Sequence, residues 1–333
     1  MKEILKGKKI LITGGAGSVG CALTKAILKY QPETIRIFDL SENEMFKMRS
    51  EFGREKAIRY LMGDIRDLNR LKLAMEDIDI VVHLAAMKHV YACEYNPFEA
   101  IKTNIDGLQN VIDVARNEGV ERMIFSSTDK AVSPSSVMGM TKLLGEKLIS
   151  LANYYKGNKK TLFSSMRFGN VMGSNGSVLP LFKKQIAAGG PITITDKEMT
   201  RFVITMEEAI SLIYSAIKLA KGGETFVWKM RTLKVVDLVD VMIEKYGLGR
   251  KIEIEIIGKG EGEKIHEEIL SEEELSHAVE LDNLYVVFPL IDHVHIDRKY
   301  KDAKAIKGPV IVSNKGHHMS KKDIMELLES LEA

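Results

Sequence analysis

The feature that most limits how this chain can fold is a glycine-rich turn close to its start. Residues 10–13 form an apolar run rich in β-branched side chains, which predicts a buried strand, and a helical repeat of apolar residues begins at Leu23. Gly14, Gly17 and Gly20 lie between these two stretches. A strand, a glycine turn and a helix in this order are typical of a dinucleotide-binding unit, in which a pyrophosphate approaches the helix N-terminus. A plain turn would also use glycines, so the interpretation depends on their position between the strand and the helix.

A second apolar strand is predicted at residues 34–38, and it ends on Asp39. A carboxylate at this point would accept hydrogen bonds from the ribose hydroxyls of an adenine dinucleotide and would repel a 2′-phosphate. Residues 40–43 contain no Arg or Lys that could neutralise such a phosphate, which favours NAD over NADP. Arg36 and Lys47 are nevertheless near in the sequence, so NADP stays as the second cofactor. A helix-cap or turn role for Asp39 would fit the same position.

Further apolar runs alternate with helical patterns, at residues 57–62, 80–84 and 161–167. This alternation predicts an α/β fold with a doubly wound parallel sheet. We expect residues 1–170 to form the dinucleotide-binding domain, to which residues around 200–230 return. Residues 171–333 are expected to form mainly a smaller α/β lobe that binds the substrate. The two parts should be interleaved, because no flexible linker or internal repeat separates them.

Composition restricts the partners of the protein. The 333 residues carry 48 basic and 46 acidic side chains, and the net charge of +2 gives no reason to expect nucleic-acid or membrane-surface binding. The spacing of Cys21 and Cys93 suits neither a metal site nor a disulfide framework, so we expect small buried thiols, no metal and a reducing compartment. The charged start of the chain predicts no signal peptide, and no run is long enough for a membrane span. These features predict a cytoplasmic protein.

The residues best suited to chemistry follow the apolar run 123–125, which predicts another strand. The strand delivers two serines and Thr128, and then the charged pair Asp129 and Lys130. Parallel α/β sheets bind their ligands at this edge, at the carboxyl ends of the strands. The alternative for Asp129 and Lys130 is an ordinary exposed turn pair.

After Pro134 the apolar spacing becomes helical, which places Lys142 in the first turns of a helix and Met138 on the same face. This spacing resembles the active site of the extended short-chain dehydrogenase/reductase family, where Tyr-x-x-x-Lys supplies a phenol base and a lysine. Here methionine takes the tyrosine position. Together with Thr-Asp-Lys-Ala from Thr128, the pattern Met-Gly-x-x-Lys resembles the UDP-N-acetylglucosamine 4,6-dehydratases, some of which carry methionine there.

The resemblance implies a Rossmann-type fold with tightly bound NAD or NADP. It implies cofactor contacts at the glycine turn, the second strand, the adenine edge, the loop after the fourth strand and the following helices: Gly14, Gly17, Ser18, Val19, Gly20, Asp39, Asp64, Ile65, Ala85, Ala86, Lys88, Asn104 and Lys142. The simpler alternative for Lys88 is a solvated loop charge.

The resemblance also implies contacts to a UDP-sugar, at Lys88, Asn170, Ser177, Val178, Arg201, Lys259 and Glu263. Arg201 would grip the diphosphate, a task suited to a planar guanidinium, although a surface salt bridge is the alternative. Relatives usually carry Arg-Pro before Gly262, where this chain has Gly260-Glu261. Lys259 would partly replace the missing arginine.

Residues 97–118 predict one long amphipathic helix, whose apolar stripe is interrupted by Asn104. A buried amide must be hydrogen-bonded, and the resemblance implies that Asn104 steadies the loop of the active-site lysine. This helix and the one after Pro134 pair across dimers in the wider superfamily, so we expect a homodimer or a higher homo-oligomer. Residues 191–196 and 199–202 are expected to supply another pair of strands.

The implied reaction converts UDP-N-acetylglucosamine to a 4-keto-6-deoxy sugar nucleotide for surface polysaccharides or glycans, with or without inversion at C5. A hydride leaves C4 and returns at C6, the C5 proton is removed, and water departs from C6. We expect Asp129, beside Thr128, to serve the 4-hydroxyl and then help to protonate the departing water. Lys130 would remove the C5 proton, for which it must be neutral part of the time, as burial near Lys142 would favour. Lys142 would bind the nicotinamide ribose, and Met138 would leave room for a water or a substrate hydroxyl.

Two other functions fit parts of the sequence. A sugar-nucleotide epimerase or reductase would share the fold and the glycines, but it would normally need the tyrosine that Met138 replaces. A non-catalytic dinucleotide-binding protein would explain the lost tyrosine. Retention of Thr128, Asp129, Lys130 and Arg201 argues against this second alternative.

Overall fold

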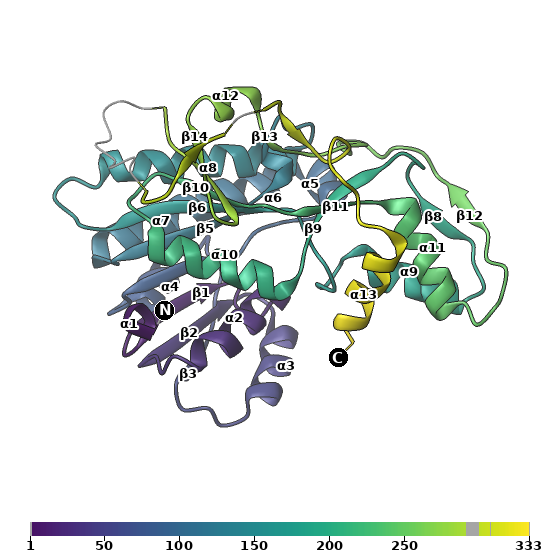
Figure 1. Ribbon diagram of the computed structural model, residues 1–333. Helices are drawn as coiled ribbons and strands as arrows, with labels where there is room; N and C mark the ends of the chain where they lie inside the picture. The colour runs from purple at the N-terminus through teal and green to yellow at the C-terminus, as the bar shows by residue number, and fades with distance from the viewer. Residues whose placement is uncertain (1, 291–299, 307, 333) are drawn as a thin grey trace.

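A computed structural model describes residues 2–290, 300–306 and 308–332. Within them the chain builds a ten-stranded sheet in the order β16-β14-β15-β10-β6-β5-β4-β1-β2-β3 (Figure 1). Its strands are β1 (Lys9–Thr13), β2 (Thr34–Asp39), β3 (Ile58–Met62), β4 (Ile80–His83), β5 (Arg122–Thr128), β6 (Leu162–Phe168), β10 (Thr225–Trp228), β14 (Ala278–Leu281), β15 (Leu284–Val287) and β16 (Lys304–Ala305).

The seven strands from β10 to β3 are parallel, whereas β15, β14 and β16 add an antiparallel edge. The order β3-β2-β1-β4-β5-β6 reverses direction between β1 and β4, which is the topology of a doubly wound dinucleotide-binding sheet. The predicted fold class is therefore confirmed. A ligand is expected beyond the carboxyl ends of β1, β4 and β5.

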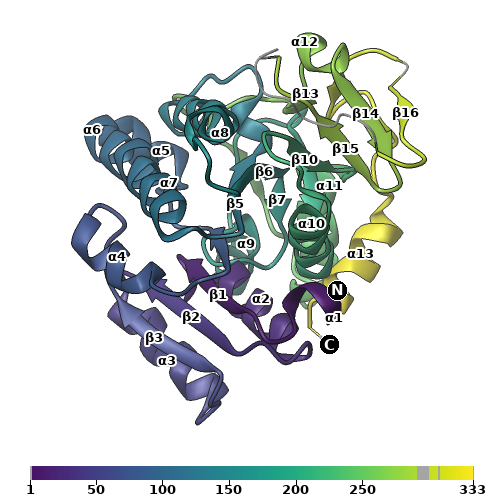
Figure 2. The ribbon, with the colours of Figure 1, turned by 90° about the vertical axis from the view of Figure 1, so that its left-hand side faces the viewer.

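Helices cover both faces of the sheet, because successive strand residues point to opposite sides (Figure 2). Ile10 and Ile12 of β1 belong to the hydrophobic core on one face of the sheet, here called the first face. Leu11 belongs to a separate core on the second face. The first face carries α2 (Ser18–Leu28), α3 (Glu42–Phe52) and α10 (Met206–Leu219), and the second carries α4 (Leu68–Met75), α7 (Gly107–Glu118) and α8 (Val137–Tyr155). A short helix α1 (Lys2–Leu5) precedes β1.

The segment before α7 differs from the single helix that the sequence predicts. It contains α5 (Val90–Tyr95), α6 (Pro97–Ile101) and the π-helical turn η1 (Lys102–Asp106). The apolar stripe could not reveal the π-helical turn, because one extra residue per turn shifts the stripe without interrupting it. Asn104 lies in this turn and is buried. Turns of this kind are often found at functional sites.

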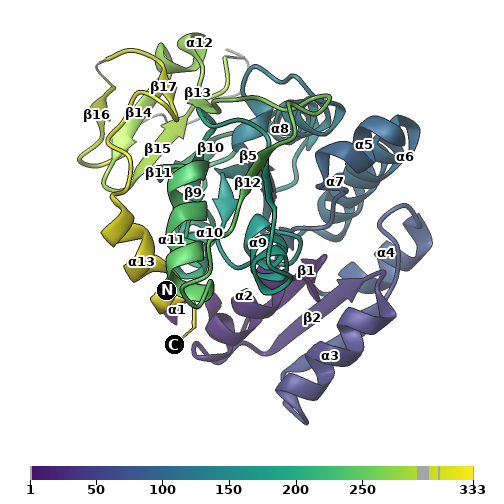
Figure 3. The same ribbon diagram turned by 90° about the vertical axis from the view of Figure 1, so that its right-hand side faces the viewer.

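A smaller lobe is built around its own core of side chains from α9, α11, α13 and the short strands beside them (Figure 3). Its elements are β7 (Asn170–Val171), α9 (Val178–Ala187), β8 (Ile192–Ile194), β9 (Thr200–Ile204), β11 (Arg231–Lys234), α11 (Val235–Tyr246), β12 (Ile254–Ile256) and α13 (Lys321–Ser330). Three further elements, β13 (Glu268–Leu270), α12 (Glu272–Leu275) and β17 (Ile311–Val312), lie near β14 at the antiparallel edge of the large sheet, where β13 pairs with β17 (Figure 3).

Two details of the second half differ from expectation. The strands expected to pair with each other at residues 191–196 and 199–202 belong to different sheets, because β8 pairs with β12 and β9 pairs with β7 and β11. Residues 206–228 return to the large sheet as α10 and β10, and so do residues 278–287, which were expected in the smaller lobe. The chain therefore crosses between its two parts more than once.

A buried arginine, Arg167, pairs with two glutamates in an ion triad and joins segments that are distant in the sequence. The Arg167 guanidinium, at 0% exposure, donates to Glu146 of α8 at 2.6 and 3.0 Å and to Glu274 of α12 at 2.7 and 3.0 Å. It also donates to the Ile269 carbonyl at 2.9 Å. Burying a charge is costly unless it is paired, so the three side chains hold β6, α8 and the segment 269–274 in one arrangement.

We predict that Arg167→Met destabilises the protein by about 3–5 kcal/mol, because two carboxylates then lose their shared cation. Chemical denaturation followed by circular dichroism measures this free energy of unfolding. The matched control is Arg116→Met, which removes an arginine whose ion pair with Asp113 is exposed and should change stability by less than about 1 kcal/mol. Equal stability of the two variants would show that the triad does not hold the segment 269–274 against β6 and α8.

Candidate functional site

The glycine turn after β1 is shaped to admit a ligand backbone. Gly14 has a φ of +64°, and a Cβ atom there would lie 2.7 Å from the backbone nitrogen of Ala85, the second residue after β4. Gly20 packs against the backbone of Gly15, which leaves no room for a side chain. Gly17 is the N-cap residue of α2, and because glycine has no side chain, the first amides of the helix have no side-chain cap from this position. The turn therefore brings the α2 N-terminus and the loop after β4 together, as a bound pyrophosphate requires.

Asp39 ends β2 beside this turn. One of its carboxylate oxygens accepts a hydrogen bond from the Ala16 amide at 3.0 Å, and the other accepts one from the Ser41 amide at 2.9 Å. Ser41, not Asp39, is the N-cap of α3, so the helix-cap alternative for Asp39 is wrong. The turn alternative agrees with the bond from the Ser41 amide, which closes a local side-chain turn. A carboxylate has further lone pairs, so both oxygens can still accept bonds from ribose hydroxyls.

The two cations that are near Asp39 in sequence are engaged elsewhere. Arg36 donates to the backbone carbonyls of Ala74 at 2.8 Å and Glu76 at 3.0 Å, at the end of α4. Lys47 forms an exposed ion pair with Glu44 at 2.5 Å. Neither contact directs positive charge at the Asp39 carboxylate, so the local chemistry fits NAD better than NADP.

The residues expected at the adenine edge and in the loop after β4 line the same side of the sheet. Asp64 pairs with Arg66 at 2.6 Å, and the hydrogen bond from Arg66 lowers the pKa of the Asp64 carboxyl. Ile65 is buried in the core of this face, so its side chain is not free for a ligand. Ala85 and Ala86 are half-buried and small, which leaves the backbone accessible.

The charged pair at the end of β5 is buried, not exposed. Asp129 has 0% of its surface exposed and the Lys130 side chain 22%, so the turn-pair alternative is wrong. One Asp129 oxygen, Oδ1, accepts hydrogen bonds from Thr128 Oγ1 at 2.8 Å and from Lys130 Nζ at 2.9 Å. The other, Oδ2, is buried without a hydrogen-bond partner among the described residues and lies against Gly169.

Glu267 is a member of this cluster that the sequence analysis did not select. It is 2% exposed, and its Oε1 lies 3.7 Å from Lys130 Nζ. Its second oxygen, Oε2, is also buried and has no hydrogen-bond partner in the part of the chain that the structure describes. No local pattern in the sequence could show that the segment before β13 folds back onto Lys130.

The two carboxylates control the charge of the amine. Burial opposes the charged form of Lys130, but attraction to Asp129 and Glu267 outweighs it, so the pKa of Lys130 is raised. Burial raises the pKa of Glu267, with Lys130 opposing and Asp129 adding to the shift. Lys130 is therefore cationic in this state, and the expectation that burial near Lys142 makes it partly neutral is wrong.

Lys142 lies in α8, where its ammonium donates to the Ser126 carbonyl at 2.9 Å and stands 4.7 Å from the centre of the Phe125 ring. Burial lowers the pKa of Lys142 to about 8, although Glu146 acts in the opposite direction. Met138, one turn earlier, is 3% exposed and packs with Cys93 and other apolar side chains.

The two cysteines were both expected to be buried. Cys93 is buried, whereas Cys21 is only half-buried.

Asn104 joins the loop after β4 to α8. Its amide exchanges hydrogen bonds with the Met87 backbone, at 2.8 and 3.0 Å, and donates to Thr141 Oγ1 at 3.0 Å. Thr141 precedes Lys142 and in turn donates to the Met138 carbonyl at 2.8 Å. Asn104 thus steadies the helical turn that carries Lys142, and its contacts stop one residue short of the lysine itself.

The loop before α9 closes over the glycine turn. Lys88 donates to the Asn175 carbonyl at 2.7 Å, and the Asn175 amide donates to Ser18 Oγ at 2.9 Å. Gly176, with a φ of +73°, passes so close to the His89 ring that a Cβ atom would lie 2.6 Å from it. Lys88 is exposed, as the solvated-charge alternative expects, and its hydrogen bond also makes it a tether between the two loops.

The other residues expected to bind substrate are distributed around the cluster. Asn170 Oδ1 lies 3.5 Å from Lys130 Nζ, and Arg201 is held by the Thr200 and Ile265 carbonyls at 2.8 and 3.1 Å while its charge acts on Lys130. Both of these partners are backbone carbonyls, and Arg201 forms no salt bridge with any described residue, in contrast to the surface salt-bridge alternative.

Ser177 caps α9, and its buried Oγ lacks a hydrogen-bond partner within residues 2–290, 300–306 and 308–332. Val178, the next residue, is partly exposed. Glu263 accepts from Thr195 Oγ1 at 3.3 Å and from the Gly260 amide at 3.1 Å, whereas Lys259 is exposed on the loop beside it. The lobe therefore carries several polar groups in these loops, although it lacks the Arg-Pro of relatives.

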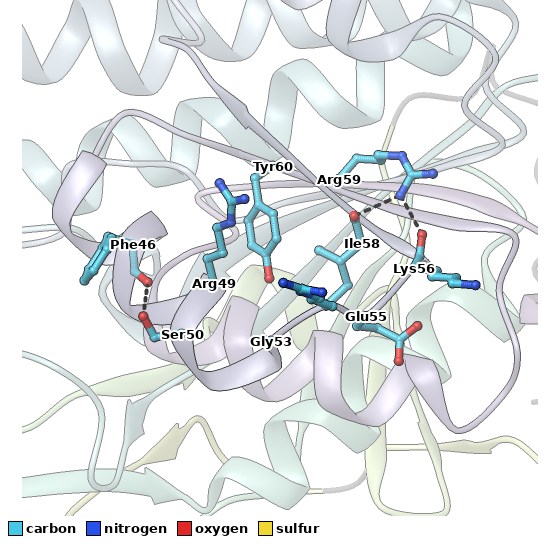
Figure 4. A pocket seen from close by; sticks show the side chains of 10 residues that line it. Phe46, Arg49, Ser50, Gly53, Glu55, Lys56, Ile58, Arg59 and Tyr60 are labelled. Carbon is cyan, nitrogen blue, oxygen red and sulfur yellow. Dashed lines mark hydrogen bonds between the residues drawn. The ribbon is translucent and has the colours of Figure 1, made fainter.

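A hollow at the other edge of the sheet does not belong to this site. It lies between α3 and the start of β3, where Arg49 stands beside Tyr60 and where Lys56 and Arg59 gather (Figure 4). The lining residues come from α3, from the loop before β3 and from the first residues of β3, whereas the cluster follows β5. The hollow is therefore at the amino end of its strand. We assign it no part in the chemistry.

The depressed pKa of Lys142 predicts a pH-dependent stability. Between about pH 8 and 10.5 the unfolded chain binds a proton that the folded chain has lost, so the stability of the wild type rises with pH in this window. Lys142→Met removes this effect. The difference in free energy of unfolding between the wild type and this variant should move by about 2 kcal/mol in favour of the wild type from pH 7 to pH 9.5.

Denaturant titrations at the two pH values measure this difference. Lys25→Met, which alters an exposed lysine of α2, is the control and should follow the wild type at both. Parallel curves for the wild type and Lys142→Met would mean that Lys142 titrates as an ordinary lysine.

Known proteins are similar to this chain over most of its length. A family model described as polysaccharide biosynthesis protein matches residues 10–289. The chain is 53% identical over 294 residues to the uncharacterized membrane protein MJ1061 of Methanocaldococcus jannaschii, covering 87% of this chain and 88% of the relative. No helix in the described ranges is long and apolar enough to cross a bilayer.

Two further relatives are named as enzymes. The chain is 41% identical over 339 residues to an inverting UDP-N-acetylglucosamine 4,6-dehydratase of Campylobacter jejuni, covering 99% of both chains. It is 39% identical over 282 residues to a UDP-glucose 4-epimerase of Rickettsia bellii, covering 84% of this chain and 82% of the relative.

Among solved structures, the X-ray structure of Pen from Bacillus thuringiensis superposes with a TM-score of 0.92 at 42% identity, covering 98% of each chain. This similarity extends over both the large sheet and the smaller lobe. With the match over residues 10–289, it shows that the chain belongs to the family of polysaccharide biosynthesis proteins.

Proposed function

We propose that the protein is an NAD-dependent UDP-N-acetylglucosamine 4,6-dehydratase, which forms a UDP-4-keto-6-deoxy-N-acetylhexosamine for polysaccharide or glycan synthesis. The observation that carries this proposal is the buried cluster of Thr128, Asp129 and Lys130 at the carboxyl end of β5, near Lys142 and Met138. Similarity over nearly the whole chain to a dehydratase of that specificity supports it.

The residues present fit an adenine dinucleotide. Gly14 and Gly20 leave space where any side chain would collide with backbone, and Asp39 is placed for a ribose. Bound there, NAD would supply a reversible store for the hydride that moves from C4 to C6 of the sugar. Lys142 would bind the nicotinamide ribose.

The proton chemistry is assigned to the cluster. Asp129 accepts the proton of the 4-hydroxyl and later returns it to the departing water, while Thr128 orients the carboxylate through its 2.8 Å hydrogen bond. Lys130 is the C5 base only if it first loses its proton, because its resting state is cationic. Met138, packed against Cys93, would have to shift before a water or a substrate hydroxyl could occupy the place of the usual phenol.

The sugar nucleotide is proposed to lie between the cluster and the smaller lobe. Its contacts would come from both parts of the chain, at Lys88, Asn170, Ser177, Val178, Arg201, Lys259 and Glu263. Arg201 combines a permanent charge with a position near Lys130, which suits a diphosphate.

An epimerase is the second candidate, because a UDP-glucose 4-epimerase is 39% identical to this chain. The replacement of the tyrosine by Met138 and the buried Asp129–Lys130 pair favour the dehydratase, since elimination of water needs an acid and a base beyond those of a simple oxidation. A non-catalytic role is less consistent with the buried Asp129 carboxylate. Its Oδ2 has no hydrogen-bond partner among the described residues, and a buried oxygen is normally hydrogen-bonded.

We further propose that the protein is a homo-oligomer of the cytoplasm, where UDP-sugars and NAD are available. Exposed apolar side chains gather on α5, α6 and α8, including Tyr91 at 79% and Phe98 at 76% exposure. Met140 and Leu144 of α8 extend the same apolar character. Large exposed apolar patches mark association sites, and a second copy of the chain offers a matching surface.

We predict that the purified protein with UDP-N-acetylglucosamine yields a product lighter by one water, detected by mass spectrometry. Lys130→Met should lower this activity by at least about 10²-fold while NAD stays bound. Lys156→Met, which removes a lysine that donates to the Thr161 carbonyl near the amino end of β5, opposite the cluster, should retain activity. Full activity of Lys130→Met would refute the assignment, and a product of unchanged mass would indicate the epimerase.

Repeating the reaction in heavy water reports whether C5 is retained or inverted.

The oligomer prediction concerns the exposed aromatic face. Tyr91→Asp combined with Phe98→Asp should shift the protein towards monomers in size-exclusion chromatography with light scattering, because charge is then placed in an apolar contact. Phe46→Asp, on the exposed surface of α3, is the control and should leave the molecular mass unchanged. An unchanged mass for the double variant would place the interface elsewhere.

A further inference from the structure

Two buried carboxylates share one amine in the proposed active site, and this arrangement has more acceptors than donors. Lys130 Nζ lies 2.9 Å from Asp129 Oδ1 and 3.7 Å from Glu267 Oε1. Asp129 Oδ2 and Glu267 Oε2 are both buried, and neither has a hydrogen-bond partner among the residues described. Buried polar oxygens are normally satisfied, so the cluster has room for at least one additional proton.

The backbone of Glu267 is held by a hydrogen bond, whereas one oxygen of its carboxyl group has no hydrogen-bond partner among the described residues. Its amide donates to Ser313 Oγ at 2.9 Å, and the Ser313 hydroxyl shares a hydrogen bond with Thr200 Oγ1 at 2.6 Å. The neighbouring His266 ring also bonds Thr200, at 2.9 Å, and so is held away from the carboxyl group. No such bond restrains Glu267 Oε2 within the described part of the chain.

The charged groups that act on Glu267 come from three segments. Lys130 and Asp129 lie in the short 3-10 helix η2 (Asp129–Ala131), Arg201 lies in β9, and Lys264 precedes Glu267 in its own segment. Lys264 is held by the Val132 carbonyl at 2.9 Å. The balance of these charges changes when Asp129 changes its protonation state, because Asp129 is the only other anion that acts on both Lys130 and Glu267 among the described groups.

We propose that Glu267 is the group that makes Lys130 a base: it takes the ammonium proton of Lys130 after Asp129 has accepted the proton of the substrate 4-hydroxyl. The inference rests on the proposed dehydratase function and assigns a step within it. Glu267 is a positioning residue, because it acts on the sugar through Lys130.

The proton transfers balance. In the first step the 4-hydroxyl proton moves to the Asp129 carboxylate as the hydride leaves C4. Lys130 then faces one carboxylate instead of two, and its proton moves to Glu267, which leaves a neutral amine and a neutral carboxyl. The amine takes the C5 proton, and Asp129 returns its proton to the C6 oxygen, which departs as water. Return of the hydride to C6 and of the Lys130 proton to C5 completes the product, and Glu267 gives its proton back to Lys130.

The resting charges explain why this transfer waits for the substrate. Two anions beside one amine hold the amine protonated, as the raised pKa of Lys130 indicates. Neutralising Asp129 removes one of these attractions while the cost of burying the remaining charges persists. A neutral pair is then favoured over an ion pair, and burial already raises the pKa of Glu267.

The test is a single-turnover experiment on the NAD-loaded enzyme with UDP-N-acetylglucosamine, in which absorbance reports the reduced nicotinamide. In the wild type the reduced form should be brief. In Glu267→Gln it should appear at a similar rate but decay about 10²-fold more slowly at pH 7, and its decay should accelerate with pH because Lys130 must release its proton to water. Glu268→Gln, whose side chain accepts a hydrogen bond from Ser133, is the matched control and should behave as the wild type.

Three outcomes would overturn the inference: unchanged decay in Glu267→Gln, equal slowing of both steps, or slow decay that does not respond to pH. Failure of the wild type to reduce its nicotinamide would instead contradict the proposed function. A readout without substrate is carbon-13 NMR of the carboxyl groups. The resonance that is lost in Glu267→Gln should titrate above the ordinary glutamate range, and titration within that range would count against the inference.

Discussion

The site depends on keeping one ion pair, Asp129 with Lys130, out of water at the end of a parallel strand. A buried charge is tolerated only when it is paired, and here the pair is made by consecutive residues, so β5 and η2 position both partners at once. The parallel sheet places this pair beside the ends of β4 and β6, where the loops that face a ligand begin. Most of the other polar contacts described above hold segments against this pair.

Those segments come from distant parts of the chain. Glu267 arrives from the region before β13, and the Arg167 triad anchors that region to β6 and α8. The loop before α9 reaches Ser18 and Lys88 through Asn175. Hydrogen bonds and ion pairs therefore hold segments from the second half of the chain against the dinucleotide-binding sheet. The repeated crossing of the chain between its two parts brings these segments together.

Local signals in the sequence were sufficient for the fold and for half of the cluster. Strand and helix periods predict β1, β2, α2 and α8, because each buries a continuous apolar face, and the strand end at Thr128 marks the site. They could not predict the π-helical turn around Asn104, the exchange of partners between β8 and β9, or the contact of Glu267 with Lys130. These features depend on which distant segments meet, and the charge state of Lys130 depends on them in turn.

The central claim is that an acid and an amine at the end of β5 replace the phenol that Met138 lacks. A crystal structure of the protein with NAD and UDP-N-acetylglucosamine tests this claim most directly. We expect an Asp129 carboxylate oxygen within about 2.6–3.2 Å of the sugar 4-hydroxyl, with Lys130 facing C5. A sugar ring bound beyond hydrogen-bond reach of Asp129, with its 4-hydroxyl on a water or on Lys142 instead, would contradict the account.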